Sequence, residues 1–174
     1  MTETLELALD RPFTFKRRPT PLACDLRPEW RLHLLVLLVD HCWAGKSSIQ
    51  QLHVLDWAIR THETREALLQ FIHGERAPNQ TIIRYDPSLN RAVDFAFAED
   101  LLTNREEELV LVRGEEKKQR GPYRVSLAKK GKELVAKLKE DQDLFAEEKQ
   151  FLKNIGRKLT QKQVESLFDW GVAK

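Results

Sequence analysis

YRVSLAKKGKELVAKLK, residues 123–139, is the stretch that indicates the fold most clearly. Its first five residues alternate between apolar and polar side chains, which predicts a strand over 123–127. Leu134, Val135 and Leu138 then recur at helical spacing, and Gly131 stands in the first turn of the helix that they predict. A strand therefore passes into a helix with almost no loop between them.

A further helix and a first strand are expected upstream of this junction. Asp86 followed by Pro87 is typical of an N-cap and a first helical residue. The apolar face of this helix is formed by Leu89, Val93, Ala96, Phe97 and Leu101. A strand over 109–113 and a turn-rich basic loop over 114–122 follow. A helix, a two-stranded hairpin and a departing helix, together covering 86–140, resemble the C-terminal half of winged helix-turn-helix domains.

The region before residue 86 is predicted to be mostly helical. Pro28 suits a first helical position, and the all-apolar run 34–39 is typical of a buried central helix. Gly45 is expected to end that helix in a left-handed cap. Ser48 followed by Gln51 predicts a capping box for the next helix. A third helix is expected from about residue 64, and a short strand over 81–85.

We therefore predict a mainly α (α+β) protein with a winged helix-turn-helix core and a two-stranded wing. Residues 1–27 are expected to form an extended N-terminal arm, because apolar residues alternate there but prolines interrupt the pattern. Residues 28–140 form the helical winged-helix domain. Residues 141–174 form a helical C-terminal tail, in which Gly156 ends one helix and Thr160 with Gln163 caps another.

Composition excludes several classes of protein. The 174 residues contain 29 Lys and Arg against 27 Asp and Glu, so the net charge of +2 excludes a uniformly basic nucleic-acid coat protein. Cys24 and Cys42 stand in unrelated contexts, which predicts free thiols in a reducing compartment. No secretory signal is recognised, and the longest apolar run, 34–39, is far shorter than a membrane span. A cytoplasmic protein that does not enter membranes is expected.

No catalytic, cofactor or metal site is predicted. The stretch AGKSS, 44–48, lacks the first glycine of a phosphate-binding loop, because Asp40 stands there. Asp40, His41, Cys42 and His53 are candidates for a metal cluster, but His41 and Cys42 are adjacent on a helix and point about 100° apart, so both do not suit one metal ion. No nucleophile and base at a recognisable spacing accompany them. We therefore expect no enzymatic activity, and no cofactor.

The most pronounced local charge lies in the predicted wing. Residues 115–132 contain seven bases and two acids, a local net charge of +5. Such a hairpin is either a solvated tip or a contact to DNA phosphates, where each base releases counterions. The DNA-backbone candidates are Lys117, Lys118, Arg120 and Arg124. The helix before the hairpin argues against reading of the major groove, because 86–104 carries a net charge of −3.

The last helix of the tail is a candidate for binding a partner. Leu167, Phe168 and Trp170 stand near the end of the sequence given, and tryptophan is a favoured interface anchor. The alternative is that this helix packs on its own domain and completes the core.

The runs LLVLLVDHCWAGKSSIQQLHVLDWAIRT (34–61), IIRYDPSLNRAVDFAFAEDLL (82–102) and GPYRVSLAKKGKELVAKL (121–138) together resemble the small middle subunit of ABC three-component, Lamassu-type bacterial defence systems. This resemblance implies a non-catalytic winged-helix subunit that links an SMC-like ATPase to an effector nuclease in anti-phage or anti-plasmid immunity. The alternative is a stand-alone, dimeric winged-helix transcription regulator that binds DNA, which the acidic helix disfavours.

Overall fold

The computed structural model describes residues 27–78, 83–104, 111–112, 115–116, 124–156 and 158–168. Its helices are α2 (Pro28–His41), α3 (Ile49–Ile59), α4 (His62–Ile72), α5 (Pro87–Ala98), α6 (Lys129–Glu140), α7 (Ala146–Ile155) and α8 (Gln161–Phe168). Its strands are β1 (Lys46–Ser48), β2 (Leu102–Asn104), β3 (Leu111–Val112), β4 (Glu115–Glu116) and β5 (Arg124–Leu127), and a 3₁₀ turn, η2 (Trp43–Gly45), precedes β1. The prediction of a mainly helical α+β chain is confirmed.

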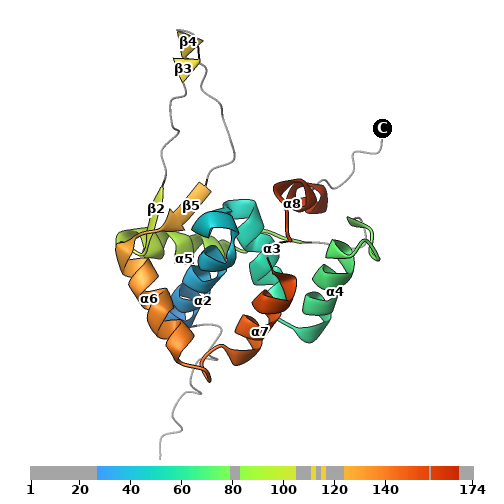
Figure 1. Ribbon diagram of the computed structural model, residues 1–174, viewed down its shortest axis with the longest axis horizontal. Coiled ribbons are helices and arrows are strands. Elements are labelled where there is room, and N and C mark those ends of the chain that lie inside the picture. Colours follow the sequence, from blue (N-terminus) through green and yellow to red (C-terminus); the bar gives the residue numbers. More distant parts are fainter. Residues whose placement is uncertain are drawn as a thin grey trace, which may run out of the picture.

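α2 lies among α3, α5 and α6, with α4 and α8 on the far side of α3, as Figure 1 shows. The six residues 34–39 of α2 are all buried, so this helix has no solvent-facing side at its centre. α5 and α6 pack on it from the hairpin side, and α3 joins it to α4 and α8. None of the helices in the described part of the chain combines the length and apolar character that crossing a bilayer requires.

A small antiparallel sheet connects distant parts of the sequence. Its strand order is β1-β5-β2, with Lys46 opposite Ser126 and Leu102 opposite Leu127. β3 and β4 form a separate two-stranded ladder. The predicted strand 123–127 is thus confirmed as β5 apart from its first residue, which lies outside the described residues. β3 lies within the predicted strand 109–113, of which residues 109, 110 and 113 lie outside the described part. The expected pairing of 109–113 with 123–127 is wrong: β3 pairs with β4, which lies in the expected loop 114–122, and β5 pairs with β1 and β2.

Several local predictions of helix starts are confirmed by hydrogen bonds. Asp86 Oδ1 accepts from the Ser88 backbone N–H at 2.8 Å, and Pro87 begins α5. The Thr160 hydroxyl accepts from the Gln163 N–H while Gln163 Oε1 accepts from the Thr160 N–H, which completes a capping box. Before α3 only one half of the predicted capping box forms: the Ser48 hydroxyl accepts from the Gln51 N–H, whereas the Gln51 side chain bonds to Ser47 and to the Leu159 carbonyl.

Other local predictions are corrected. α2 ends at His41, and Gly45, with φ +63°, belongs to the turn that leads into β1. The described residues of the expected strand 81–85 form no strand, because Ile83 inserts into the core instead of pairing in a sheet. β1 and β2 were not predicted, since three-residue strands have no periodicity of their own and depend on β5.

The expected tail shares one core with the preceding helices. Phe151, Leu152 and Ile155 of α7 and Val164 and Leu167 of α8 are buried in the same apolar cluster as α2. Hydrogen bonds also fasten this region to the body; among them, His41 Nε2 donates to the Gly156 carbonyl at 2.6 Å, Gln51 Nε2 to the Leu159 carbonyl, and the Ser48 hydroxyl to Gln161 Oε1. Residues 141–168 are therefore part of the folded body, and the predicted arm 1–27 lies outside the described residues except for Arg27.

Candidate functional site

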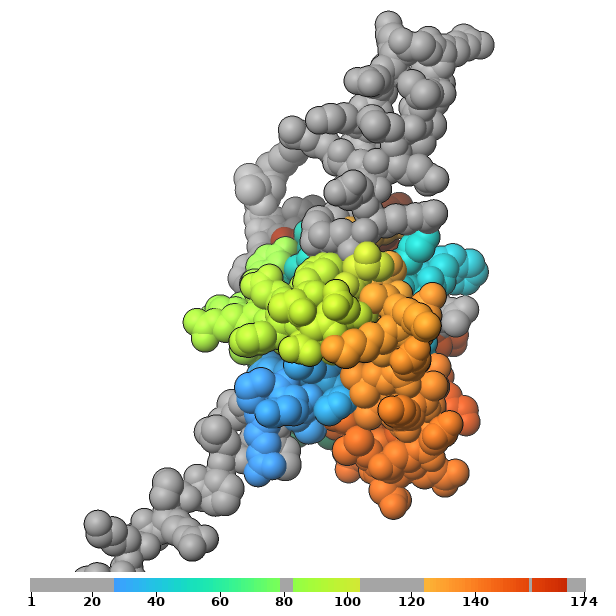
Figure 2. Space-filling model, turned by 90° about the vertical axis from the view of Figure 1, so that its left-hand side faces the viewer, coloured from blue at the N-terminus to red at the C-terminus, as the bar shows by residue number. Residues whose placement is uncertain are grey.

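An apolar groove lies where α2, α5 and α6 meet, on the face shown in Figure 2. It has a volume of about 320 Å³, and its apolar walls come from Pro28, Leu32, Phe95, Leu101 and Leu134. Phe95 is 55% exposed although it is a large aromatic side chain. An exposed aromatic residue at an apolar hollow is typical of a surface that binds another molecule.

The helical period of α5 explains why Phe95 faces solvent. Leu89, Ala92, Val93 and Ala96 form the buried face of α5. Phe95 stands outside that face, beside the exposed Asp94. At the edge of the groove, Lys130 Nζ contacts Glu99 Oε2 at 3.2 Å, which ties the start of α6 to the end of α5. Phe95 was not predicted as a site residue. The sequence feature that could have indicated it is an aromatic residue outside the apolar stripe of an amphipathic helix.

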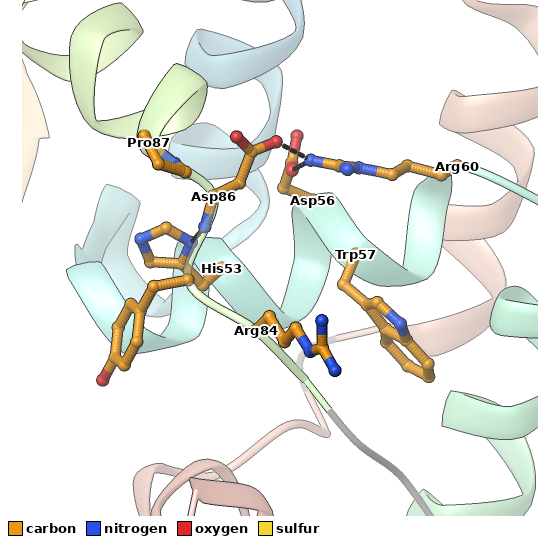
Figure 3. A pocket seen from close by; sticks show the side chains of 8 residues that line it. His53, Asp56, Trp57, Arg60, Arg84, Asp86 and Pro87 are labelled. Carbon is orange, nitrogen blue, oxygen red and sulfur yellow. Dashed lines mark hydrogen bonds and ion pairs between the residues drawn. The ribbon is translucent and has the colours of Figure 1, made fainter.

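A second hollow, between α3 and the residues that lead into α5, is polar (Figure 3). The Arg60 guanidinium bonds to the Asp56 carboxylate at 2.5 Å and also bonds to the Asp86 carboxylate. Arg31 of α2 lies 3.5 Å from Asp86 and 4.0 Å from Asp56. Two carboxylates and two guanidiniums thus neutralise each other at the point where three helices meet. This network positions the start of α5.

The N-cap role of Asp86 is reinforced by its charge partners. Partial burial raises the pKa of Asp86, but hydrogen bonds from Ser88 and the Arg60 guanidinium outweigh it, so that the pKa lies well below its usual range. The carboxylate therefore stays ionised over the ordinary pH range. An ionised acceptor at a helix N-terminus stabilises the helix.

His53 is buried beneath the same hollow, with 1% of its surface exposed. Its Nδ1 accepts from the Asp86 backbone N–H at 3.2 Å, so the proton of the neutral ring is on Nε2, which lies 3.0 Å from Asn90 Oδ1. Burial lowers the pKa of His53 below its usual value, and the bond to Asn90 only partly opposes that effect. The ring is therefore neutral and serves as a link between α3 and α5.

Acidification is expected to destabilise the chain through His53. The pKa of His53 is lowered in the folded chain, so the unfolded chain binds more protons than the folded chain below a pH of about 6.5. The free energy of unfolding therefore falls as the pH is lowered through this range, by up to about 1.4 kcal/mol per pH unit. Urea unfolding at a series of pH values between about 5 and 7.5 measures this slope. His53→Asn is expected to be less stable at neutral pH and to lack most of the slope; an unchanged slope would assign it to other groups.

The residues weighed as a metal cluster are separately engaged. Asp40 pairs with Lys139 at 2.6 Å, and His41 bonds to the Gly156 carbonyl. Burial raises the pKa of the Cys42 thiol to about 11, so the group is a protonated donor, to the Leu38 carbonyl at 3.2 Å. Within the described ranges no three His, Cys, Asp or Glu side chains are grouped to hold a metal ion. Residues 44–48 form the turn and strand β1.

Of the four predicted DNA contacts, Arg124 is the one that belongs to the described residues. Lys117, Lys118 and Arg120 lie outside the described residues. Arg124 is exposed at the start of β5, opposite Ser48 of β1. Because Arg124 is exposed and alternates with the buried Val125, it lies on the outer side of the sheet.

The predicted partner contacts divide between core and surface. Leu167 is 2% exposed and belongs to the chain's own core, in agreement with the alternative that α8 completes the body. Phe168 is partly buried and stacks on Tyr85, with ring centroids 4.9 Å apart. Trp170 lies outside the described residues. α8 is therefore held by its own chain through Leu167. Of the two predicted partner contacts that are described, Phe168 is the one with a partly exposed side chain.

Comparison of the chain with protein-family models, with curated proteins and with solved structures found no match.

Proposed function

We propose that the chain is a non-catalytic winged-helix subunit that bridges an SMC-like ATPase and an effector nuclease in a cytoplasmic bacterial defence complex, with DNA contact on the side of its hairpin. The order α2, β1, α3, α5, β2, β5 and α6, with β5 between β1 and β2, supports the winged-helix assignment. The resemblance of 34–138 to middle subunits of Lamassu-type systems supports the choice of complex.

The outward face of α5 is the observation that carries the proposal. In a winged helix that reads DNA, the helix before the hairpin enters the major groove. Here the exposed side chains of that helix and its end include Phe95 and three acids, Asp94, Glu99 and Asp100, against one base, Arg91. Carboxylates there repel phosphates, whereas an exposed aromatic ring beside an apolar groove favours a protein partner. This face also disfavours a stand-alone regulator that would insert α5 into DNA.

The test is co-expression with the products of the neighbouring genes, followed by purification through a tag on this chain. Recovery of an SMC-like ATPase and a nuclease supports the bridging role. Their absence, with a stable dimer of this chain on a palindromic duplex, would establish the regulator instead.

Phe95→Ala is expected to weaken the complex by about 2 kcal/mol or more, about 30-fold in Kd, because an exposed aromatic ring at a groove is a typical interface hot spot. The measurement is the Kd of the purified subunits by calorimetry. The matched control is Leu144→Ala, which removes another exposed apolar side chain, 40% exposed, from the loop before α7. Equal affinity of the Phe95 variant and the wild-type chain would place the interface elsewhere.

A further inference from the structure

The outer face of the three-stranded sheet is polar and basic. Along β5, Val125 and Leu127 point into the core, so Arg124 and Ser126 point outward. The register places Lys46 of β1 and Thr103 of β2 on either side of Ser126. The Ser126 hydroxyl donates to the Thr103 carbonyl. On the opposite face Val125, Leu127 and Leu102 are buried in the core together with Ser47.

The start of α6 continues this basic surface. β5 passes directly into α6 after one residue, as Figure 1 shows. Lys129 and Lys132 are exposed and one helical turn apart, while Lys130 points to Glu99 on the other side of the helix. We call Lys46, Arg124, Lys129 and Lys132 the sheet patch. Lys46, Thr103, Arg124 and Ser126, the residues of the outer face that are not fully buried, include no carboxylate.

We infer that the sheet patch binds the phosphate backbone of duplex DNA. Lys, Arg and hydroxyl side chains are the groups that contact phosphates in protein–DNA interfaces. Cores of protein interfaces instead contain aromatic and other apolar residues, which Lys46, Thr103, Arg124 and Ser126 do not supply. The segment that joins β2 and β5, residues 105–123, carries five bases and five acids and adds no net charge. The basic groups of this surface are therefore those of the sheet and of the first turn of α6, and Glu133, one turn after Lys129, is an exposed acid beside them.

This inference rests on the DNA contact included in the proposed function and gives it a location. The segment 86–104, which contains α5, has a net charge of −3 and would be turned away from the duplex, so the groove beside α5 stays available to a protein partner. DNA is then contacted without base readout, and the complex is expected to bind duplexes of any sequence with similar affinity.

The test is the salt dependence of DNA binding by the full chain. The probe is a short, fluorescently labelled duplex of mixed sequence, and anisotropy gives Kd between roughly 50 and 200 mM salt. Each phosphate contact adds about 0.9 to the slope of log K against log salt, so four contacts weaken binding about 150-fold over this range. Replacing Lys46, Arg124 and Lys129 together with glutamine is expected to reduce the magnitude of the slope by about 2.7.

The matched control replaces Lys153, Lys158 and Lys162, which are exposed on and near α7 and α8, with glutamine. It changes the net charge equally and is expected to keep at least most of the slope. Equal loss in both variants would show a general effect of charge and would overturn the inference. The inference would also be overturned if the triple variant at Lys46, Arg124 and Lys129 bound DNA with the affinity of the wild-type chain. The same holds if that variant kept its DNA affinity and lost a partner protein instead. Co-purification of the ATPase is measured separately, so that failure of the bridging role can be distinguished from failure of DNA binding by the sheet patch.

Discussion

Gly131→Ala is expected to destabilise the chain by about 3 kcal/mol or more, the upper end of the range for overpacking. A Cβ atom built on Gly131 would stand 2.1 Å from the Leu101 carbonyl oxygen and 3.2 Å from a methyl carbon of Leu127. The nearest atom is backbone, and it is itself held, since the Leu101 carbonyl accepts from the Ala128 N–H at 3.0 Å. α6 would have to move away from β2, and the sheet and α2 would lose contacts with it.

The measurement is urea unfolding followed by circular dichroism, compared with Ala136→Gly on the exposed face of α6. That control is expected to lose only about 1 kcal/mol, the difference in helix propensity between the two residues. Propensity alone predicts that Gly131→Ala stabilises α6 by the same amount. A stabilised Gly131→Ala variant would therefore show that α6 does not approach β2 closely.

Truncation after Gly156 is expected to lower Tm by roughly 10 °C or more, or to abolish soluble expression. It removes Leu159, Val164 and Leu167, which are at most 8% exposed and each contribute about 1.5–3 kcal/mol by burial. It also uncovers the α3 residues on which α8 packs. For a chain of this size each lost kcal/mol corresponds to about 2–4 °C.

Leu167→Ala keeps this prediction testable if the truncated chain cannot be purified. That single change is expected to lose about 2–5 kcal/mol, because the side chain is enclosed by the core. Thermal unfolding of the full-length variant gives the value. A truncated chain with unchanged Tm that no longer joins its complex would instead restore the hypothesis that α8 is held only by a partner.

The local features of the fold were predictable because short-range interactions create them. Asp86 and Pro87 start α5 with a hydrogen bond two residues away, and Thr160 and Gln163 cap α8 within one turn. The run 34–39 predicted a buried helix because no polar side chain interrupts it. In each case the partners that stabilise the element stand within a few positions of one another in the sequence.

Contacts between distant residues lie beyond what local patterns determine. β1 exists because Lys46–Ser48 pairs with residues 124–126, and β2 exists because Leu102–Asn104 pairs with the same strand. Ile83 fits a strand pattern, but its side chain fills the core, and the described residues 83–86 form no strand.

The candidate surfaces also have some properties that could be predicted from the sequence and others that depend on the fold. The net charges of −3 over 86–104 and of +5 over 115–132 could be counted in the sequence, whereas the exposure of Phe95 at a groove and the burial of Leu167 could not. By itself the sequence determined where helices begin, which faces are apolar and where charge of one sign gathers, because neighbouring residues decide those properties. Only the tertiary structure decided which apolar side chains are covered and which glycine admits no side chain, because both depend on elements that meet only after folding.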